Sequence, residues 1–470
     1  MPASRPRAGW TLAIVSIALF MTSLDNLVVG VALPSIRTEL GGSLESLEWT
    51  VNAYTLAFAV FLISGAALGD RFGRKRVFAL GLTLFTASSA AAALAPSIDA
   101  LIAARALQGL GAAMVTPLTL TLLSEAVPEE KRGLALGIWA GTSGLGVALG
   151  PFVGGLVVEG IAWQWIFWLN VPIGIVLIPL ALRRLTESFG PASTLDVRGV
   201  ALAGVGLFGL VFGIVRAQAL GWTSTTVVTS ITVGVLLLAS FLLWERRAPA
   251  PMLPLRFFKA RGFSATNGVA FAMFFGTFGS IFLLSQYFQT AQGYSPFEAG
   301  LRTLPWTGMP MLVAPIAGIL SDRIGSRPLM AGGLALQAGA LAWLSTLLDP
   351  ATPYSEVIVP FVMAGTGMAL VFAPSANAIL AAVRPQEAGQ ASGATNAIRE
   401  VGGVLGVAVL ASVFAAHGSY LSPEAYSDGV AAALPVGAAA LAAGAIVALF
   451  VPRRAAAPAE TAVVPEGAAA

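Results

Sequence analysis

The sequence lacks several residue types on which many protein functions depend. None of its 470 residues is a cysteine, and only His417 is a histidine. The chain can therefore form no disulfide and no thiolate metal site, and a lone histidine does not make a metal centre. It contains no GxxxxGK[ST] loop, so we do not expect ATP to drive it. We expect no metal, no cofactor and no enzymatic activity.

Charged residues are also scarce. Only 10% of the residues are charged, whereas 57% are hydrophobic; a soluble domain carries about 25% charged residues. Apolar runs of about 20 residues recur from end to end, and each is long enough to cross a bilayer as a helix. These runs do not alternate polar and apolar residues as barrel strands do. The composition predicts an all-α polytopic protein whose surroundings are the lipid bilayer and not nucleic acid.

Fourteen runs are predicted to span the membrane. They cover roughly 10–31, 49–69, 77–95, 99–123, 134–157, 163–182, 197–217, 225–244, 264–288, 300–320, 328–347, 356–380, 392–415 and 429–451. Lysine and arginine divide unevenly between the joining segments: 21 lie at the termini and in alternate segments, whereas only Arg37 and Arg302 lie in the others. Because positive residues concentrate in cytoplasmic loops, both termini are predicted to be cytoplasmic, which requires an even number of spans.

One charged segment has a second copy. Residues 68–76 read LGDRFGRKR, and residues 318–327 read GILSDRIGSR. Aligned on Asp-Arg-x-Gly, the copies pair Asp70 with Asp322 at an offset of 322 − 70 = 252 residues. The offset is eight spans, whereas a repeat of two six-span halves would give six. Internal repeats of this kind build many transporters, with the substrate site between the halves.

The offset predicts the organisation of the chain. Two extra spans lie between two six-span halves, and the tail is rich in Ala, Pro and Glu, a composition typical of disorder. The predicted parts are a first half at 1–190, an insertion at 191–250, a second half at 251–452 and a disordered cytoplasmic tail at 453–470.

Six segments together resemble a known family. GDRFGRKR is similar to the signature between spans two and three of the major facilitator superfamily. The others follow in order: SLDNLVVGVALPSI (23–36), RALQGLGAA (105–113), GVALGPFVGG (146–155), WQWIFWLNVPIG (163–174) and NAIREVGGVLGVAV (396–409). With fourteen spans, the resemblance narrows to the drug:proton antiporter group of QacA- and EmrB-like multidrug exporters.

The resemblance implies a fold and a function. The fold is the major facilitator fold, with two six-helix halves, two additional central helices and cytoplasmic termini. The function is export of lipophilic small molecules, drugs or antibiotics, across the bacterial plasma membrane in exchange for protons, by a monomer that works by alternating access. Uptake of a metabolite by proton symport, and a non-transporting receptor or scaffold, are the alternatives.

Four charged residues lie well inside predicted spans: Asp25, Arg105, Arg399 and Glu400. Charge in the bilayer is costly, so each should face a partner or a cavity. The resemblance implies that Asp25 and Arg105 act in proton coupling or substrate recognition. Structural hydrogen bonds or ion pairs would also account for them, and the sequence does not say whether the two meet. Neighbours on a helix lie about 100° apart, so Arg399 and Glu400 need not pair; a substrate or proton site and a structural role stay open for both.

Glycines form a stripe in the fifth predicted span. Gly146, Gly150 and Gly154 recur every four residues and so share one helix face, where another backbone can approach closely. Pro151 removes a helix hydrogen bond. Ordinary packing would explain these features. The resemblance implies more, because the run from Gly146 to Gly155 fits the antiporter motif GxxxGPxxGG, which marks export and not uptake.

The segment LGDRFGRKR can be read as a topological anchor or as a gate. Its basic residues favour the cytoplasmic side, but Asp70 contributes nothing to that signal. The resemblance implies that Asp70 engages the N-terminus of a neighbouring helix and an arginine, which closes the cytoplasmic side. The predicted gate residues are Gly69, Asp70, Arg71, Gly73, Arg74, Asp322 and Arg323.

Overall fold

The computed structural model describes residues 6–41, 44–128, 131–190, 196–249, 251, 253–384 and 387–452, and all the regular structure within these ranges is helical. The elements are α1 (Pro6–Leu40), α2 (Leu44–Phe72), α3 (Arg74–Ala93), α4 (Ile98–Ala126), α5 (Arg132–Gly160), α6 (Trp165–Trp168), α7 (Asn170–Arg184), α8 (Val197–Leu220), α9 (Thr225–Glu245), the 3-10 helix η2 (Leu255–Lys259), α10 (Arg261–Thr290), α11 (Pro296–Thr307), α12 (Met309–Ile324), α13 (Ser326–Leu347), α14 (Tyr354–Ala381), α15 (Ala388–His417) and α16 (Pro423–Ala448). The predicted tail at 453–470 lies outside the described residues.

Each predicted span coincides with helix. Thirteen stretches of the described chain are long and apolar enough to cross a membrane. Helix α5 is not among these thirteen, although it has 29 residues and packs along α1 and α12. A total of fourteen spans stays a prediction. The tenth predicted span is split at Gly308 into α11 and α12, where Pro305 and Pro310 remove backbone donors.

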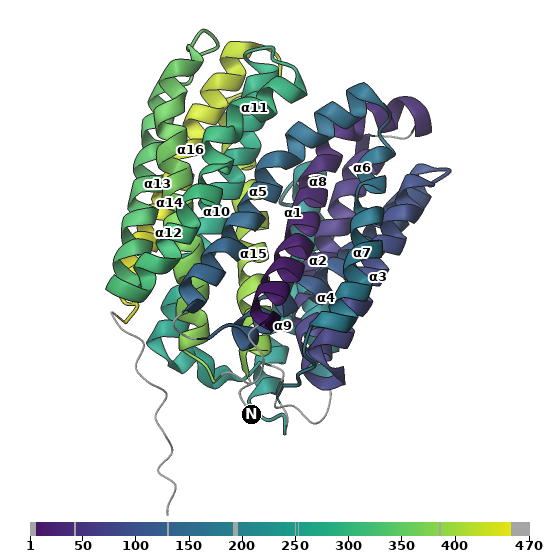
Figure 1. The fold of residues 1–470 in the computed structure, drawn as a ribbon. Coiled ribbons are helices and arrows are strands. Elements are labelled where there is room, and N and C mark those ends of the chain that lie inside the picture. The colour runs from purple at the N-terminus through teal and green to yellow at the C-terminus, as the bar shows by residue number, and fades with distance from the viewer. Residues whose placement is uncertain are drawn as a thin grey trace, which may run out of the picture.

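The helices form two groups that lie side by side, with α5 and α15 between them (Figure 1). Helices α1–α7 pack on one another and are called the first group; helices α10–α16 are the second group. The groups meet where α5 packs on α11 and α12, and where α2 packs on α15. Helices α8 and α9 form a hairpin, and α8 contacts both α2 and α15.

Helix α5 carries glycine on two of its faces. A Cβ at Gly146 would lie 2.8 Å from the Phe20 carbonyl oxygen of α1, and one at Gly154 would lie 2.9 Å from Val28. Gly146 and Gly154 of the predicted stripe therefore pack on α1, and the Pro151 side chain is outside the described part. Gly137, which was not singled out from the sequence, lies on a second face of α5 that packs on α12. A Cβ at Gly137 would lie 2.6 Å from the Ala314 carbonyl oxygen. Glycine on both faces lets one helix join the two groups at close range.

The repeated charged segment is a tight turn and not a loop. Gly73 alone separates α2 from α3, and Gly325 alone separates α12 from α13. Their φ angles are +103° and +85°, a conformation that residues with a Cβ rarely adopt. This explains why both copies hold glycine there. The third predicted span, expected from residue 77, begins at Arg74, so Arg74 belongs to a helix.

We predict that the α5–α12 contact is sensitive to a single methyl group. Gly137→Ala should lower the apparent unfolding temperature of the purified protein, because its Cβ meets backbone atoms that cannot move aside; overpacking costs about 1–3 kcal/mol. The matched control is Gly339→Ala in α13, where nothing lies within 4 Å of the added Cβ. That control should be neutral or stabilising by up to about 1 kcal/mol. Equal unfolding temperatures for the two variants would contradict this account.

Candidate functional site

An ion pair lies at the centre of the first group. The Arg105 Nη1 donates to Asp25 Oδ2 at 2.5 Å, and neither side chain is exposed. The sequence singled out both residues but could not say that they meet. Asp25 comes from α1 and Arg105 from α4, 80 residues apart in the chain. Each is the partner that the other needs in a dry environment.

Three polar side chains complete the shell around Asp25. Gln108 Nε2 donates to Asp25 Oδ1 at 2.8 Å, and Asn170 Nδ2 donates to the same oxygen at 2.7 Å. Gln108 and Asn170 also donate to Ser89 Oγ, at 3.2 Å and 3.0 Å. These residues come from α3, α4 and α7 and are fully buried. The Asp25 carboxylate therefore joins α1 to α4 and α7, and Ser89 links the two amides to α3.

Arg105 is held by further acceptors and by aromatic rings. Its Nε donates to the Thr50 carbonyl oxygen at 3.1 Å, and its Nη1 donates to Gln108 Oε1 at 2.7 Å. The guanidinium carbon lies 4.3 Å from the centroid of the Tyr54 ring, a cation–π distance. The charge of Arg105 is thus matched by a carboxylate, a carbonyl, an amide oxygen and an aromatic face.

A glycine in the RALQGLGAA segment explains how α4 reaches this position. A Cβ at Gly109 would overlap the Tyr54 carbonyl of α2. Since glycine removes that overlap, α4 and α2 come close enough for Arg105 to contact both Thr50 and Tyr54. The segment therefore supplies the charge, the amide of Gln108 and the close approach together.

Arg399 of the second group has a different environment. It is 3% exposed, and its Nη2 donates to Ser375 Oγ at 3.1 Å. Its Nε has no hydrogen-bond partner. No ion pair joins Arg399 to an acid in the described part of the chain. Glu400, the adjacent residue, is half-buried and lies within electrostatic range of Tyr54 and Arg399.

A second ion network lies at the end of the bundle where α1 begins and α2 ends, here called the basic end (Figure 1). Arg74 Nε donates to Asp70 Oδ1 at 2.8 Å, and Arg74 Nη1 also pairs with Glu125 of α4. Asp70 and Arg74 are buried. Arg71 is exposed and stays outside this network, although the sequence placed it in the gate.

Asp70 also contacts the second group. A Cβ at Gly389, in the first turn of α15, would lie 2.5 Å from Asp70 Oδ1, so only glycine leaves room for the carboxylate. The predicted contacts of Asp70 with an arginine and with the start of a neighbouring helix are both present in the geometry. Gly69 packs against Leu118 of α4, and a Cβ there would overlap that side chain.

The second copy makes the reciprocal contact. Asp322 lies against Gly133 in the first turn of α5, where a Cβ would overlap the carboxylate. The Asn377 Nδ2 donates to Asp322 Oδ1 at 3.1 Å. Asp322 and Arg323 are both exposed, and no ion pair to Asp322 occurs among the described residues. Each group thus places an aspartate at the start of a helix that packs between the groups, but only Asp70 is buried.

The start of α15 is held from another side as well. Glu387, which precedes α15, is buried and pairs with Arg256 of η2 and with Arg384, the latter at 2.5 Å. Burial acts to raise the pKa of Glu387, but hydrogen bonds from Arg384 and Arg256 outweigh burial and lower that pKa below its ordinary value. Glu387 therefore stays ionised and fixes the segment after α9 against α15.

Several residues of these networks were not singled out from the sequence as functional: Ser89, Gln108, Asn170, Glu125 and Glu387. A signal for Gln108 was available, since it lies three residues after Arg105 on the same helix. Asn170 lies within WQWIFWLNVPIG, which was noted only for its family resemblance. Arg74, the partner of Glu125, was expected between two spans and not within a helix.

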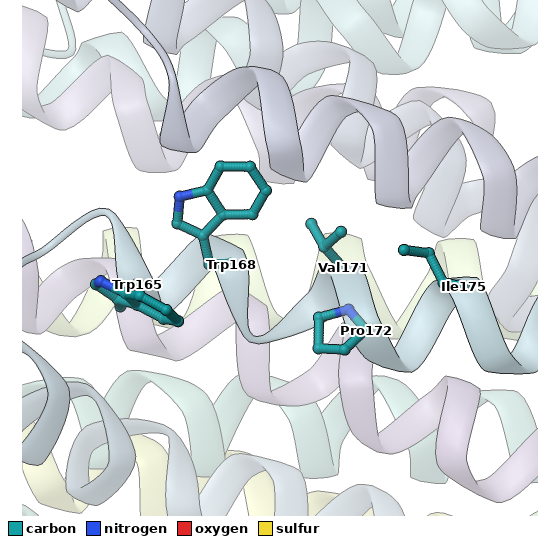
Figure 2. Close-up of a pocket in the computed structure, with 5 residues that line it drawn as sticks. All are labelled: Trp165, Trp168, Val171, Pro172 and Ile175. Atoms are coloured by element: carbon teal, nitrogen blue, oxygen red, sulfur yellow. The ribbon is translucent and has the colours of Figure 1, made fainter.

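A shallow apolar pocket lies on the surface of α6 and α7 and is lined by Trp165, Trp168, Val171, Pro172 and Ile175 (Figure 2). Its lining side chains carry no charge, and Trp165 and Ile175 are exposed. It is separate from the ion networks, and in a membrane protein such a surface is suited to lipid chains.

Comparisons with known proteins identify the family of the chain. A family model described as Major Facilitator Superfamily matches residues 15–407 and 266–467. The chain is 35% identical over 431 residues to the tetracenomycin C resistance and export protein of Streptomyces glaucescens, covering 91% of this chain and 80% of the relative. It is 37% identical over 409 residues to the multidrug resistance protein Stp of Mycobacterium tuberculosis (strain CDC 1551 / Oshkosh), covering 86% and 76%. It is 35% identical over 410 residues to the methylenomycin A resistance protein of Streptomyces coelicolor, covering 86% of each.

A solved structure supports the same fold. The human organic anion transporter MFSD10 (TETRAN) superposes with a TM-score of 0.65 at 14% identity, covering 94% of this chain and 100% of that one. The family match and the relatives confirm the predicted resemblance, the all-helical fold and a multi-pass location in the bacterial plasma membrane. They also confirm a transporter and not an enzyme. The chain belongs to the major facilitator superfamily.

Proposed function

We propose that this chain exports lipophilic small molecules, antibiotics among them, from the cytoplasm in exchange for protons. Three relatives carry names that describe antibiotic or multidrug resistance, and one of them is named for export. The single observation that supports proton coupling is the fully buried pair of Asp25 and Arg105. An acid deep in an apolar span costs stability, and such acids in transporters serve as proton or substrate sites.

The chemistry of the pair suggests how coupling works. A carboxylate that holds an arginine stays ionised, whereas one that loses its arginine in a dry bundle takes up a proton. Rearrangement of α1 against α4 would therefore bind a proton when the pair opens and release it when the pair forms again. One pH unit supplies about 1.4 kcal/mol per proton, and moving one charge adds about 2.3 kcal/mol per 100 mV.

The basic end would then act as the cytoplasmic gate. Asp70 holds Arg74 and lies against Gly389 of α15, and these contacts support a role in holding this end closed. Opening the basic end requires α15 to separate from α2, and α5 to separate from α12. Contacts at helix ends are worth about 0.3–2 kcal/mol each, enough to bias two nearly balanced states without locking either. Close packing of Gly146 and Gly154 on α1 supports export and not uptake, as the antiporter motif implies.

We predict that Asp25→Asn abolishes substrate-driven proton movement. The amide keeps the size of the carboxylate but cannot exchange a proton, so proteoliposomes carrying the variant should show no substrate-dependent change in a pH-sensitive dye. Glu39→Gln is the matched control, because Glu39 lies on the same helix and, within the described part of the chain, bonds only to Trp163 and Gln164, at 2.7 Å each. Flux by the Asp25 variant equal to wild type would clear Asp25 of coupling, and inverted vesicles give the direction of transport.

We also predict that replacing Arg71 and replacing Arg74, the two arginines near Asp70, have different effects on the transport rate. Arg74→Gln should slow transport about tenfold or more, because removing one partner of a buried ion pair costs several kcal/mol in the state that contains it. Arg71→Gln should transport nearly as wild type, since Arg71 is exposed. The chain has no cysteine, so Leu421→Cys, at a 93% exposed position, reports topology by labelling. Inverted labelling in the Arg74 variant would instead assign that residue to the topological anchor.

A further inference from the structure

Arg399 is a buried cation that forms no ion pair in the described chain, and the adjacent Glu400 lies only within electrostatic range of it. Among the described residues the one hydrogen bond of Arg399 goes to the neutral hydroxyl of Ser375. Its Nε is buried with no acceptor. Guanidinium stays charged at all physiological pH values, so it cannot shed its proton to relieve the burial. An unpaired ion in such a place costs several kcal/mol unless a partner arrives.

Arg105 is a buried arginine of the same protein that does have an anionic partner, although its Nη2, like the Nε of Arg399, has no hydrogen-bond partner. It is fully buried, and it donates to a carboxylate, an amide and a carbonyl. Both arginines face aromatic rings, so that feature does not distinguish them. The difference is the direct ion pair: Arg105 pairs with Asp25, whereas no acid of the described chain pairs directly with Arg399, and Glu400 lies only within electrostatic range. This difference is expected of an arginine that binds an anionic ligand.

The rings around Arg399 form an aromatic surface. The guanidinium carbon lies 5.6 Å from the Phe274 ring centroid and 5.5 Å from that of Phe372. Phe274 stacks on Phe278 with centroids 5.0 Å apart. Phe271 and Phe275 lie on the same face of α10 as Phe274 and Phe278, because offsets of three, four and seven residues bring side chains to one face of a helix. Phe271, Phe275 and Phe278 are only half-buried.

We infer that Arg399 binds the acidic group of an aromatic substrate, a carboxylate or a phenolate, whose rings lie on Phe274 and Phe278. Arginine suits this role, because its planar fork can hold an oxyanion through two parallel hydrogen bonds. The free Nε supplies one donor toward the missing anion. Offset stacking on phenylalanine adds affinity for a flat ring system. The inference rests on the proposed export function and names its substrate class.

The position of α15 makes such a site useful to a transporter. Ser392 of this helix donates to the Pro117 carbonyl oxygen of α4 at 3.1 Å, so α15 contacts the first group directly. Glu400, one residue from Arg399, lies in electrostatic range of Tyr54, which itself covers Arg105. An anion at Arg399 would therefore sit next to the contact through which the two groups move.

The test compares two dyes that share a flat ring scaffold and differ in charge, the anionic fluorescein and the cationic rhodamine 6G. Fluorescence anisotropy of the purified full-length protein measures the affinity for each. We expect wild type to bind fluorescein more tightly than rhodamine 6G. Arg399→Gln should weaken fluorescein binding about ten- to a hundredfold, since hydrogen bonds to charged groups are that strong. Binding of rhodamine 6G should be unchanged or tighter.

Two further variants keep the result interpretable. Arg302→Gln removes another arginine that stacks on a ring, 3.4 Å from the Tyr294 centroid, and should leave fluorescein binding intact. Arg399→Lys keeps the charge without the planar fork and should fall between wild type and Arg399→Gln. Thermal unfolding of each variant reports its folding.

The proposal is overturned if wild type does not prefer fluorescein, if Arg399→Gln keeps that preference, or if it loses both dyes equally. An equal loss would assign Arg399 a structural role. Because the assay measures binding without transport, its outcome is independent of the export assay. If the protein binds anions selectively but does not export substrate, the proposed function is refuted and the anion-binding site is retained.

Discussion

Charge buried beyond the reach of water is the constraint on which this structure depends. The bilayer interior offers no solvent to a carboxylate or a guanidinium, so each needs a partner from another helix. Asp25 and Arg105 meet this need together, and Gln108 and Asn170 complete the carboxylate shell. The result is a polar centre that joins five helices of the first group through α1, α2, α3, α4 and α7. A change in that pairing would alter the contacts of all five helices.

The same constraint acts where the two groups meet. Asp70 pairs with Arg74 and lies against α15, while Asp322 lies against α5. Each group thus closes on the interfacial helix of the other, and glycine at 133 and 389 makes room for the two carboxylates. The contacts are unequal, because Asp70 is buried in an ion network and Asp322 is exposed beside Asn377. Separating the groups at this end should therefore be limited more by Asp70 than by Asp322.

Much of the fold was visible in the sequence, because long apolar runs, paired glycines and isolated charges are local signals. The match of Gly73 with Gly325 was visible in the sequence, but the tight turn that their positive φ angles form was not predicted. The side-chain partners of the charged residues were not predictable. Apolar periodicity does not show that Asp25 pairs with Arg105, or that Asn170 donates a hydrogen bond to the Asp25 carboxylate. Arg74 lies four residues after Asp70, a spacing that pairs residues on a helix. That signal was missed because a loop was expected there. Which face of α5 packs on α12 was also not predictable, because it depends on contacts between residues far apart in the sequence.

The central claim is that the Asp25–Arg105 pair exchanges a proton for substrate. The most direct measurement is proton release by the purified protein in a weakly buffered solution when a transported substrate is added. The account predicts that wild type releases protons in proportion to the substrate bound, and that the Asp25→Asn protein binds the substrate without releasing protons. Equal proton release by the two proteins would contradict it, because the exchanging group would then lie elsewhere.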